Sequence, residues 1–146
     1  MLMQEATTKI LLVGSELPLL EGLSQSLASA GFTPLVAQTL HEGRELAAHG
    51  APLVAVISRL LAASLSAETL SIPLAPGGAL LLYRSVGTPL VTLSPTVQRV
   101  VLADLTLPLE RNRLMALVHH VGGRAQATGR GRTSGETDQV TPERSA

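Results

Sequence analysis

Apolar and polar positions follow two different periods between residues 8 and 121. Short continuous apolar runs are typical of strands covered on both faces, whereas apolar residues that recur every three or four positions are typical of helices packed on one side. The two patterns alternate, which predicts parallel strands joined by crossover helices. The runs that predict strands are residues 9–13, 33–38, 52–58, 79–83 and 100–105.

The segments between these runs carry helix signals. Gly31 follows the first helical stretch as a stop signal, and the hydroxyl of Thr39 can cap the second while Glu42 reaches back toward the cap. Prolines and glycines interrupt residues 84–95, so that this segment is either a strand or a loop. The predicted helices cover residues 17–30, 39–49, 60–70 and 108–121, with a short one around residues 95–99.

The composition changes at Gly122. From there to Ala146 the chain contains one large aliphatic residue, Val140, among glycines, serines, threonines, arginines and acids. This segment has four arginines and three acidic residues, and so small an excess of positive charge does not indicate a nucleic-acid-binding arm. We therefore predict one domain over residues 1–121 and a disordered polar tail over residues 122–146.

The overall composition excludes several classes of protein. Lys and Arg number 11 and so do Asp and Glu, so the chain has no electrostatic footprint for nucleic acid or anionic lipid. Phe32 and Tyr83 are the two aromatic residues, too few to stack bases, and the absence of cysteine removes disulfides and thiolate chemistry. The first apolar run is too short for a secretory signal or a membrane span. We expect a cytoplasmic protein that contacts neither membrane nor nucleic acid directly.

Three segments together resemble a CheY-like response-regulator receiver domain. ILLVGSELPLLEGLSQSLASAGF resembles its first strand and helix, PLVAVIS resembles its third strand, and ADLTLPLERNRLMALVHHV resembles its fifth strand and last helix. The resemblance covers about residues 8 to 121. It implies a three-layer, flavodoxin-like (βα)5 fold of the α/β class, with a parallel five-stranded sheet of order 2-1-3-4-5 and a fourth helix that is short or absent.

The chain departs from that family at the reactive positions. Gly14 and Ser15 stand where the family has its magnesium-binding acidic pair, Ser58 stands at the phosphoacceptor aspartate, and Leu107 replaces the lysine of the Lys-Pro step. Magnesium needs several hard oxygen ligands, and phosphoryl transfer depends on positioning and charge neutralisation. Ser58 has no adjacent His or carboxylate as a base. The resemblance therefore implies a degenerate, non-enzymatic pseudo-receiver with no catalytic residue, metal or cofactor.

The segment LSPTVQRVVLADLTLPLERNRLMALVHH is similar to the end of the receiver-like N-terminal domain of FleQ-type flagellar transcription regulators. In that family the domain tends to lack the phosphorylation residues and precedes an ATPase module and a DNA-binding domain. This chain has no GxxxxGK[ST] loop, so the family's ATP, cyclic-dinucleotide and DNA functions are assigned to none of its residues. A relic or a truncated piece of a longer regulator is one alternative.

Other polar residues have a functional and a structural interpretation. Ser15 either binds an anion at the first helix or, more simply, caps that helix. Arg99, Arg111 and Arg113 either contact a partner or form a solvated face, and in receiver domains the corresponding face commonly mediates dimerisation.

Two functional hypotheses follow. The first is a pseudo-receiver that binds a protein partner, a second copy included, in two-component or phosphorelay signalling or in transcriptional control, flagellar control among them. The second is a sensor of an anion or cyclic dinucleotide at the carboxyl edge of the sheet, where open α/β sheets bind ligands, with Gly14, Ser15 and Ser58 in the site.

Overall fold

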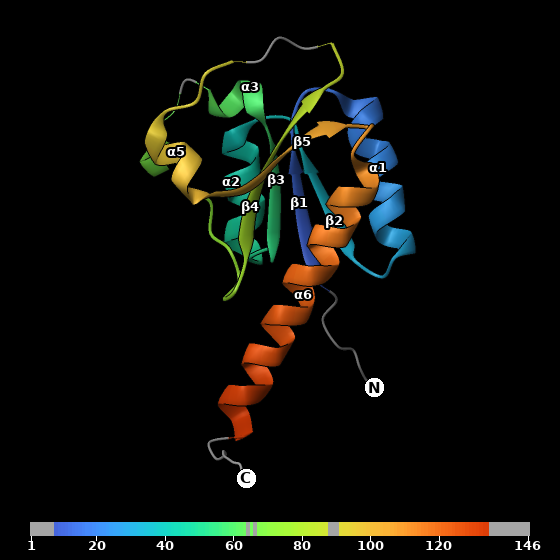
Figure 1. Ribbon diagram of the computed structural model, residues 1–146, viewed down its shortest axis with the longest axis vertical. Coiled ribbons are helices and arrows are strands. Elements are labelled where there is room, and N and C mark those ends of the chain that lie inside the picture. Colours follow the sequence, from blue (N-terminus) through green and yellow to red (C-terminus); the bar gives the residue numbers. More distant parts are fainter. Residues whose placement is uncertain (1–7, 64, 66, 88–90, 135–146) are drawn as a thin grey trace.

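The computed structural model describes residues 8–63, 65, 67–87 and 91–134. Its centre is a five-stranded parallel sheet of order β2-β1-β3-β4-β5 between two layers of helices (Figure 1). The predicted α/β class, strand order and three-layer architecture are therefore confirmed. The strands are β1 (Lys9–Val13), β2 (Thr33–Ala37), β3 (Val54–Ser58), β4 (Ala79–Ser85) and β5 (Val101–Leu107).

Alternate strand residues divide between two apolar cores. Ile10, Leu12 and Val56 belong to the core beneath α1 and α6, whereas Leu11 and Ile57 belong to the opposite core. This division follows from the two-residue period of a strand, and it explains why the strand runs are apolar throughout. The helices are α1 (Leu17–Ser29) and α6 (Arg111–Ser134) on one face, and α2 (Leu40–His49), α3 (Arg59–Ala62), α4 (Ala67–Leu70) and α5 (Pro95–Val100) on the other.

The start of α2 shows how local chemistry fixes an element. The Glu42 amide donates a 3.1 Å hydrogen bond to Thr39 Oγ1, and Glu42 Oε1 accepts a 2.9 Å bond from the Gln38 amide. The cap predicted from Thr39 and Glu42 is confirmed. Because both bonds satisfy amides that lack a helical partner, they set the first residue of the helix.

Residues 60–70 form two short helices instead of the single predicted one. The Leu65 amide bonds to the Ala62 carbonyl, a tighter turn than the α-helical spacing, and α3 ends there. The short helix predicted around residues 95–99 is present as α5. In the ambiguous segment, residues 91–94 are neither helix nor strand, and residues 88–90 lie outside the described part of the chain.

The last helix runs further than the sequence indicated. We expected it to end at residue 121, but α6 continues through Ser134, past the amino end of the sheet (Figure 1). The expectation was wrong because residues 122–134 are mostly small or polar and lack the apolar periodicity that predicts a helix. Residues 135–146 of the predicted tail lie outside the described part, and the tail as a separate unit stays a prediction. No described helix is long and apolar enough to cross a membrane.

Candidate functional site at the carboxyl ends of the strands

The parallel sheet brings the candidate residues of neighbouring strands to one edge. Gly14 follows β1 directly, and Ser58 is the last residue of β3, the strand paired with β1. Tyr83 on β4 lies opposite Ser58 in register. These three residues are all buried. The sheet therefore places Gly14 and Ser58 near each other, as predicted, and adds a tyrosine that the sequence reasoning did not assign to the site.

Tyr83 reaches across this edge of the sheet. Its side chain is fully buried, and its hydroxyl donates a 2.6 Å hydrogen bond to Glu16 Oε1. The Ser58 side chain also hydrogen-bonds to Tyr83. A neutral donor, a carboxylate acceptor and a serine hydroxyl thus satisfy one another in a small polar network. We call Glu16, Ser58 and Tyr83 the tyrosine network.

Gly14 is the residue that makes room for this network. A Cβ atom placed on Gly14 would collide with the hydroxyl oxygen of Tyr83 and would lie 3.2 Å from Glu16 Oε1. Any side chain at position 14 therefore competes with the phenol for the same volume. The space that a side chain at position 14 would take is filled here by Tyr83.

The tyrosine network favours a neutral phenol. Burial, followed by the hydrogen bond and charge of Glu16, raises the pKa of Tyr83 well above its ordinary value of 10.0. The phenol therefore stays protonated and donates to Glu16 at physiological pH. One Glu16 oxygen is already occupied by this bond, and a single carboxylate is far short of the ligand set magnesium takes. No group of three or more His, Asp or Glu that could hold a metal occurs among the described residues.

The loop between β1 and α1 differs from the prediction in one detail. Ser15 was expected to cap α1, but the capping position is Glu16, and no side chain hydrogen-bonds to the free amides there. Ser15 is exposed, and its carbonyl accepts a 3.0 Å bond from the Leu17 amide. The prediction failed because the turn displaces the helix start by one residue and the Glu16 carboxylate is engaged by Tyr83.

Leu107 ends β5 at the same edge but takes no part in the tyrosine network. It is fully buried in the core beneath α1 and α6, and its carbonyl accepts a bond from the Val86 amide. Ser85 lies opposite Leu107 in register, and its buried hydroxyl has no hydrogen-bond partner. Leu107 is therefore an apolar core residue rather than a polar group of this edge.

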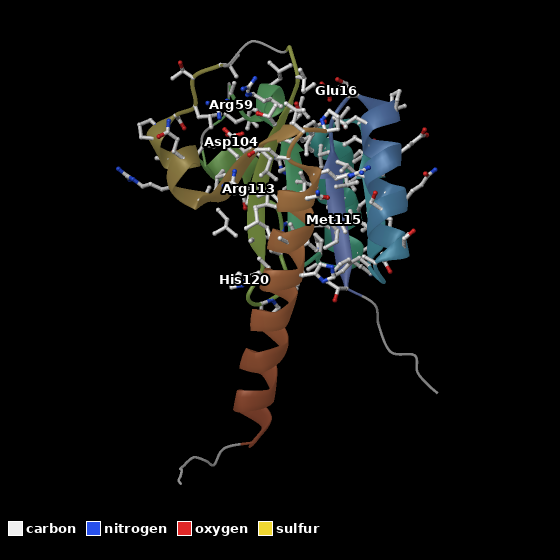
Figure 2. The ribbon with its side chains drawn as sticks, turned by 45° about the vertical axis from the view of Figure 1, so that its right-hand side comes forward. Glu16, Arg59, Asp104, Arg113, Met115 and His120 are labelled. Carbon is white, nitrogen blue, oxygen red and sulfur yellow. The ribbon has the colours of Figure 1, made fainter. Side chains whose placement is uncertain are left out.

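Arg59 and Asp104 form a second polar contact that the sequence reasoning missed. They make an ion pair between α3 and β5, and Arg59 is 12% exposed (Figure 2). Arg59 also donates from Nε and Nη2 to the Val91 carbonyl, at 3.0 and 2.8 Å. Three segments distant in sequence are therefore joined by one guanidinium. The signal available in the sequence was the single arginine directly after the most apolar strand.

The three arginines predicted to contact a partner lie in different surroundings. Arg99 lines a cavity at the amino ends of β4 and β5, whereas Arg111 lines a smaller one between α1 and the start of α6. Arg113 is paired with Glu110 at 3.2 Å. The two cavities share no residue, so the structure does not gather the arginines into one site. Their role in binding a partner stays a prediction.

No protein-family model matches the sequence, and no curated protein matches it either. Solved structures of receiver domains do match its fold. A CheY-like receiver domain from Methanospirillum hungatei JF-1 has a TM-score of 0.59 at 15% identity, covering 84% of this chain and 99% of that chain. The receiver domain of an HD domain-containing protein from Pseudomonas fluorescens Pf-5 has a TM-score of 0.64 at 17% identity, covering 84% and 99%.

A third structure is described as the beryllofluoride-activated NtrC4 receiver domain dimer. Its TM-score is 0.58 at 17% identity, and the match covers 77% of this chain and 94% of that chain. At these identities the comparisons establish the fold and leave the function to the residues of this chain. The chain therefore has the fold of CheY-like receiver domains.

Proposed function

We propose that this chain is a non-phosphorylatable pseudo-receiver, a non-enzymatic module that regulates bacterial signalling or transcription, flagellar control included, by binding a protein partner. The receiver fold supports the regulatory half of the proposal. The tyrosine network supports the claim that the protein is not phosphorylated, because Tyr83 fills the space over Gly14 that a metal-binding carboxylate would need. Cytoplasmic location and the absence of direct nucleic-acid binding belong to the same proposal.

The single observation that carries the proposal is the hydrogen bond between Tyr83 and Glu16. It occupies one oxygen of the Glu16 carboxylate and the proton of the phenol, so that neither group is free to serve as a full ligand for a cation or a phosphoryl group. Ser58 is engaged by the same phenol, and no His or carboxylate is adjacent to it in the sequence to act as a base. The same crowding weighs against the alternative of an anion or cyclic-dinucleotide sensor at this edge.

Calorimetry with magnesium and beryllofluoride, a mimic of the phosphoryl group, tests the closed site. We expect no heat of binding to the protein, with an intact receiver domain as the positive control. A matched pair of variants sharpens the experiment: Tyr83→Phe removes the hydroxyl, and Tyr83→Leu also opens the space over Gly14. Binding of beryllofluoride by the unmodified protein would refute the closed site.

Light scattering tests the claim that the protein acts by binding a protein partner. We expect the purified protein to form a defined complex, with itself or with a regulator captured from the native host and then purified. The double variant Arg111→Glu and Arg113→Glu should weaken that complex if the start of α6 is the contact surface. Arg44→Glu on α2, in the opposite helical layer, is the matched control. A complex equally strong in all three proteins would rule out the α6 arginines.

A further inference from the structure

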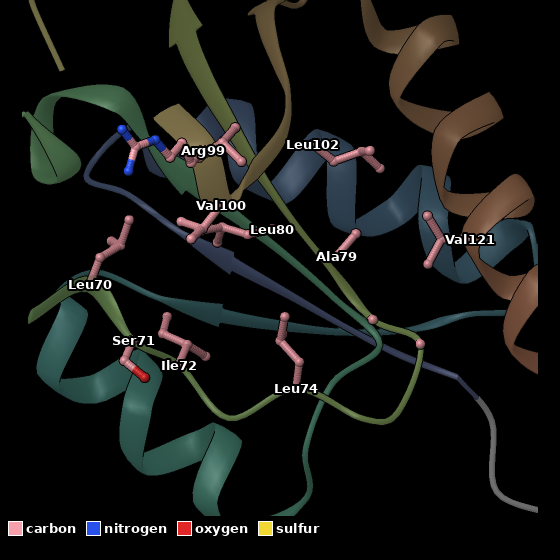
Figure 3. Close-up of a pocket in the computed structure, with 13 residues that line it drawn as sticks. Leu70, Ser71, Ile72, Leu74, Ala79, Leu80, Arg99, Val100, Leu102 and Val121 are labelled. Carbon is pink, nitrogen blue, oxygen red and sulfur yellow. The ribbon is translucent and has the colours of Figure 1, made fainter. Parts of the chain in front are cut away.

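A groove lies at the amino ends of β4 and β5, at the opposite edge of the sheet from the tyrosine network. Its volume is about 470 Å³, and the chain segment after α4 forms one wall while β4, the end of α5 and the start of β5 form the other (Figure 3). We call it the amino-end groove. Its large apolar lining residues include Leu70, Ile72, Leu74, Leu80, Val100 and Leu102.

The groove exists because the sheet is incompletely covered here. The helix that crosses from β4 to β5 has six residues and is too short to lie along both strands. The register also shifts: Leu80 pairs with Val101, but Leu81 pairs with Ala103, so that Leu102 is an extra residue in β5. As a result Val100 and Leu102 are 50% and 49% exposed, an unfavourable arrangement for large aliphatic side chains unless something covers them.

Charge identifies the kind of molecule that fits. Arg99 is the one charged side chain among the thirteen described residues that line the groove, and within the described part of the chain it makes no ion pair. It lies at one end of the groove, and Val121 lies at the other (Figure 3). The lining therefore combines a long apolar wall with a single positive charge at one end.

We propose that the amino-end groove binds a small amphiphilic carboxylate, with its aliphatic chain along the leucine and valine side chains and its carboxylate on Arg99. The groove volume lies within the range of about 300–1,000 Å³ that is usual for small-molecule sites. Arg99 and Ser71 supply the polar side chains of the lining, too few for the many polar groups of a nucleotide or an extended peptide. An aliphatic chain has no such groups to satisfy.

This inference goes beyond the proposed function and is independent of it. The ligand site and the tyrosine network lie at opposite edges of the sheet, so either can fail without the other.

Titration of the protein with decanoate, monitored by calorimetry and by backbone amide chemical shifts, tests the proposal. We expect saturable one-to-one binding below the micelle concentration, with shifts concentrated at Leu80, Val100 and Leu102. Decanol, which has the same chain without the charge, should bind about tenfold more weakly or worse, as loss of a charged hydrogen bond implies. Decyltrimethylammonium should bind more weakly still.

Two variants test separately how the ligand's carboxylate and its aliphatic tail are bound. Arg99→Gln should abolish the preference for decanoate over decanol, whereas Arg113→Gln, an exposed arginine outside the groove, should leave it unchanged. Ser71→Phe places a ring at an exposed position of the wall and should block both ligands without affecting folding, which circular dichroism verifies. No binding, or equal binding of decanoate and decanol, would overturn the proposal. So would a wild-type dimer that Ser71→Phe converts to monomer, since a second copy would then cover the groove.

Discussion

Tyr83 and Glu16 lie 67 residues apart in sequence and are joined by a 2.6 Å hydrogen bond. The bond links β4 to the residue that precedes α1, and it passes through volume that Gly14 leaves free. Glycine and tyrosine are thus complementary: the Tyr83 hydroxyl occupies the volume that any side chain at position 14 would need. The receiver fold of this chain therefore carries a buried tyrosine side chain at the carboxyl edge of its sheet.

The pKa of Tyr83 can be measured directly, because this chain has one tyrosine and no tryptophan. Its pKa is raised above 10.0, so the unfolded chain releases the phenol proton at lower pH than the native protein. The stability that the raised pKa contributes is therefore complete below pH 10 and is lost as the pH rises further. Ultraviolet absorbance should show phenolate only as the protein unfolds.

Tyr83→Phe provides the matched comparison. The difference in unfolding free energy between wild type and this variant should shrink above pH 10 by about 1.4 kcal/mol per pH unit. A phenolate signal with a midpoint near 10 in the still folded protein would show that Tyr83 is not held by Glu16 as described.

Substitution of Gly14 tests the crowding over the site. Gly14→Ala introduces a Cβ into the Tyr83 hydroxyl, and we expect a loss of about 1–3 kcal/mol in the free energy of unfolding, the usual cost of overpacking. Urea unfolding monitored by circular dichroism gives the value. Gly14→Asp should be at least as damaging.

The control for Gly14→Ala is Gly22→Ala. Gly22 lies inside α1, and a Cβ there meets no atom within 4 Å. This change should stabilise the protein by about 0.5–1 kcal/mol, because alanine favours helix. Combining Gly14→Ala with Tyr83→Leu should cost less than the sum of the single changes. Strict additivity would mean that the two positions do not compete for space.

Glu110 gives a prediction in the acid range. Its carboxylate accepts a 2.7 Å bond from the Thr106 amide and pairs with Arg113, and these contacts, the Thr106 bond first, lower its pKa below 4.5. A lowered pKa contributes stability above pH 4.5 that is lost as the pH falls through the folded-state pKa.

Glu110→Gln should therefore be less stable than wild type at neutral pH and equal to it in strong acid. Urea unfolding at the two pH values measures the difference. Glu21→Gln, an exposed position on α1, is the control and should show no such convergence. If the difference in unfolding free energy between wild type and Glu110→Gln persists unchanged into strong acid, the charge of Glu110 does not have this role.

The sequence was sufficient for the architecture and insufficient for the site. Strand runs such as residues 9–13 are local signals, and their spacing fixes the parallel topology. The positions of Gly14 and Ser58 follow from that topology. The pairing of Tyr83 with Glu16 does not, because apolar periodicity places Tyr83 in a strand without indicating which way its ring points.

The second missed contact has the same cause. Arg59 reaches Asp104 and the Val91 carbonyl, and nothing in the local pattern of any one segment links the three. The short helices α3 and α4 were merged in the prediction because the tight turn between them depends on backbone hydrogen bonds rather than on residue type. Local signals therefore predict elements, and contacts between distant elements decide the chemistry.

The most direct test of the central claim is incubation of the folded protein with acetyl phosphate and magnesium, followed by intact mass measurement. We predict that the mass stays that of the unmodified chain, while an intact receiver domain treated in parallel gains a phosphoryl group. A magnesium-dependent phosphoryl adduct on the wild-type protein, mapped to Glu16 or Ser58, would contradict the closed site and the proposed function with it.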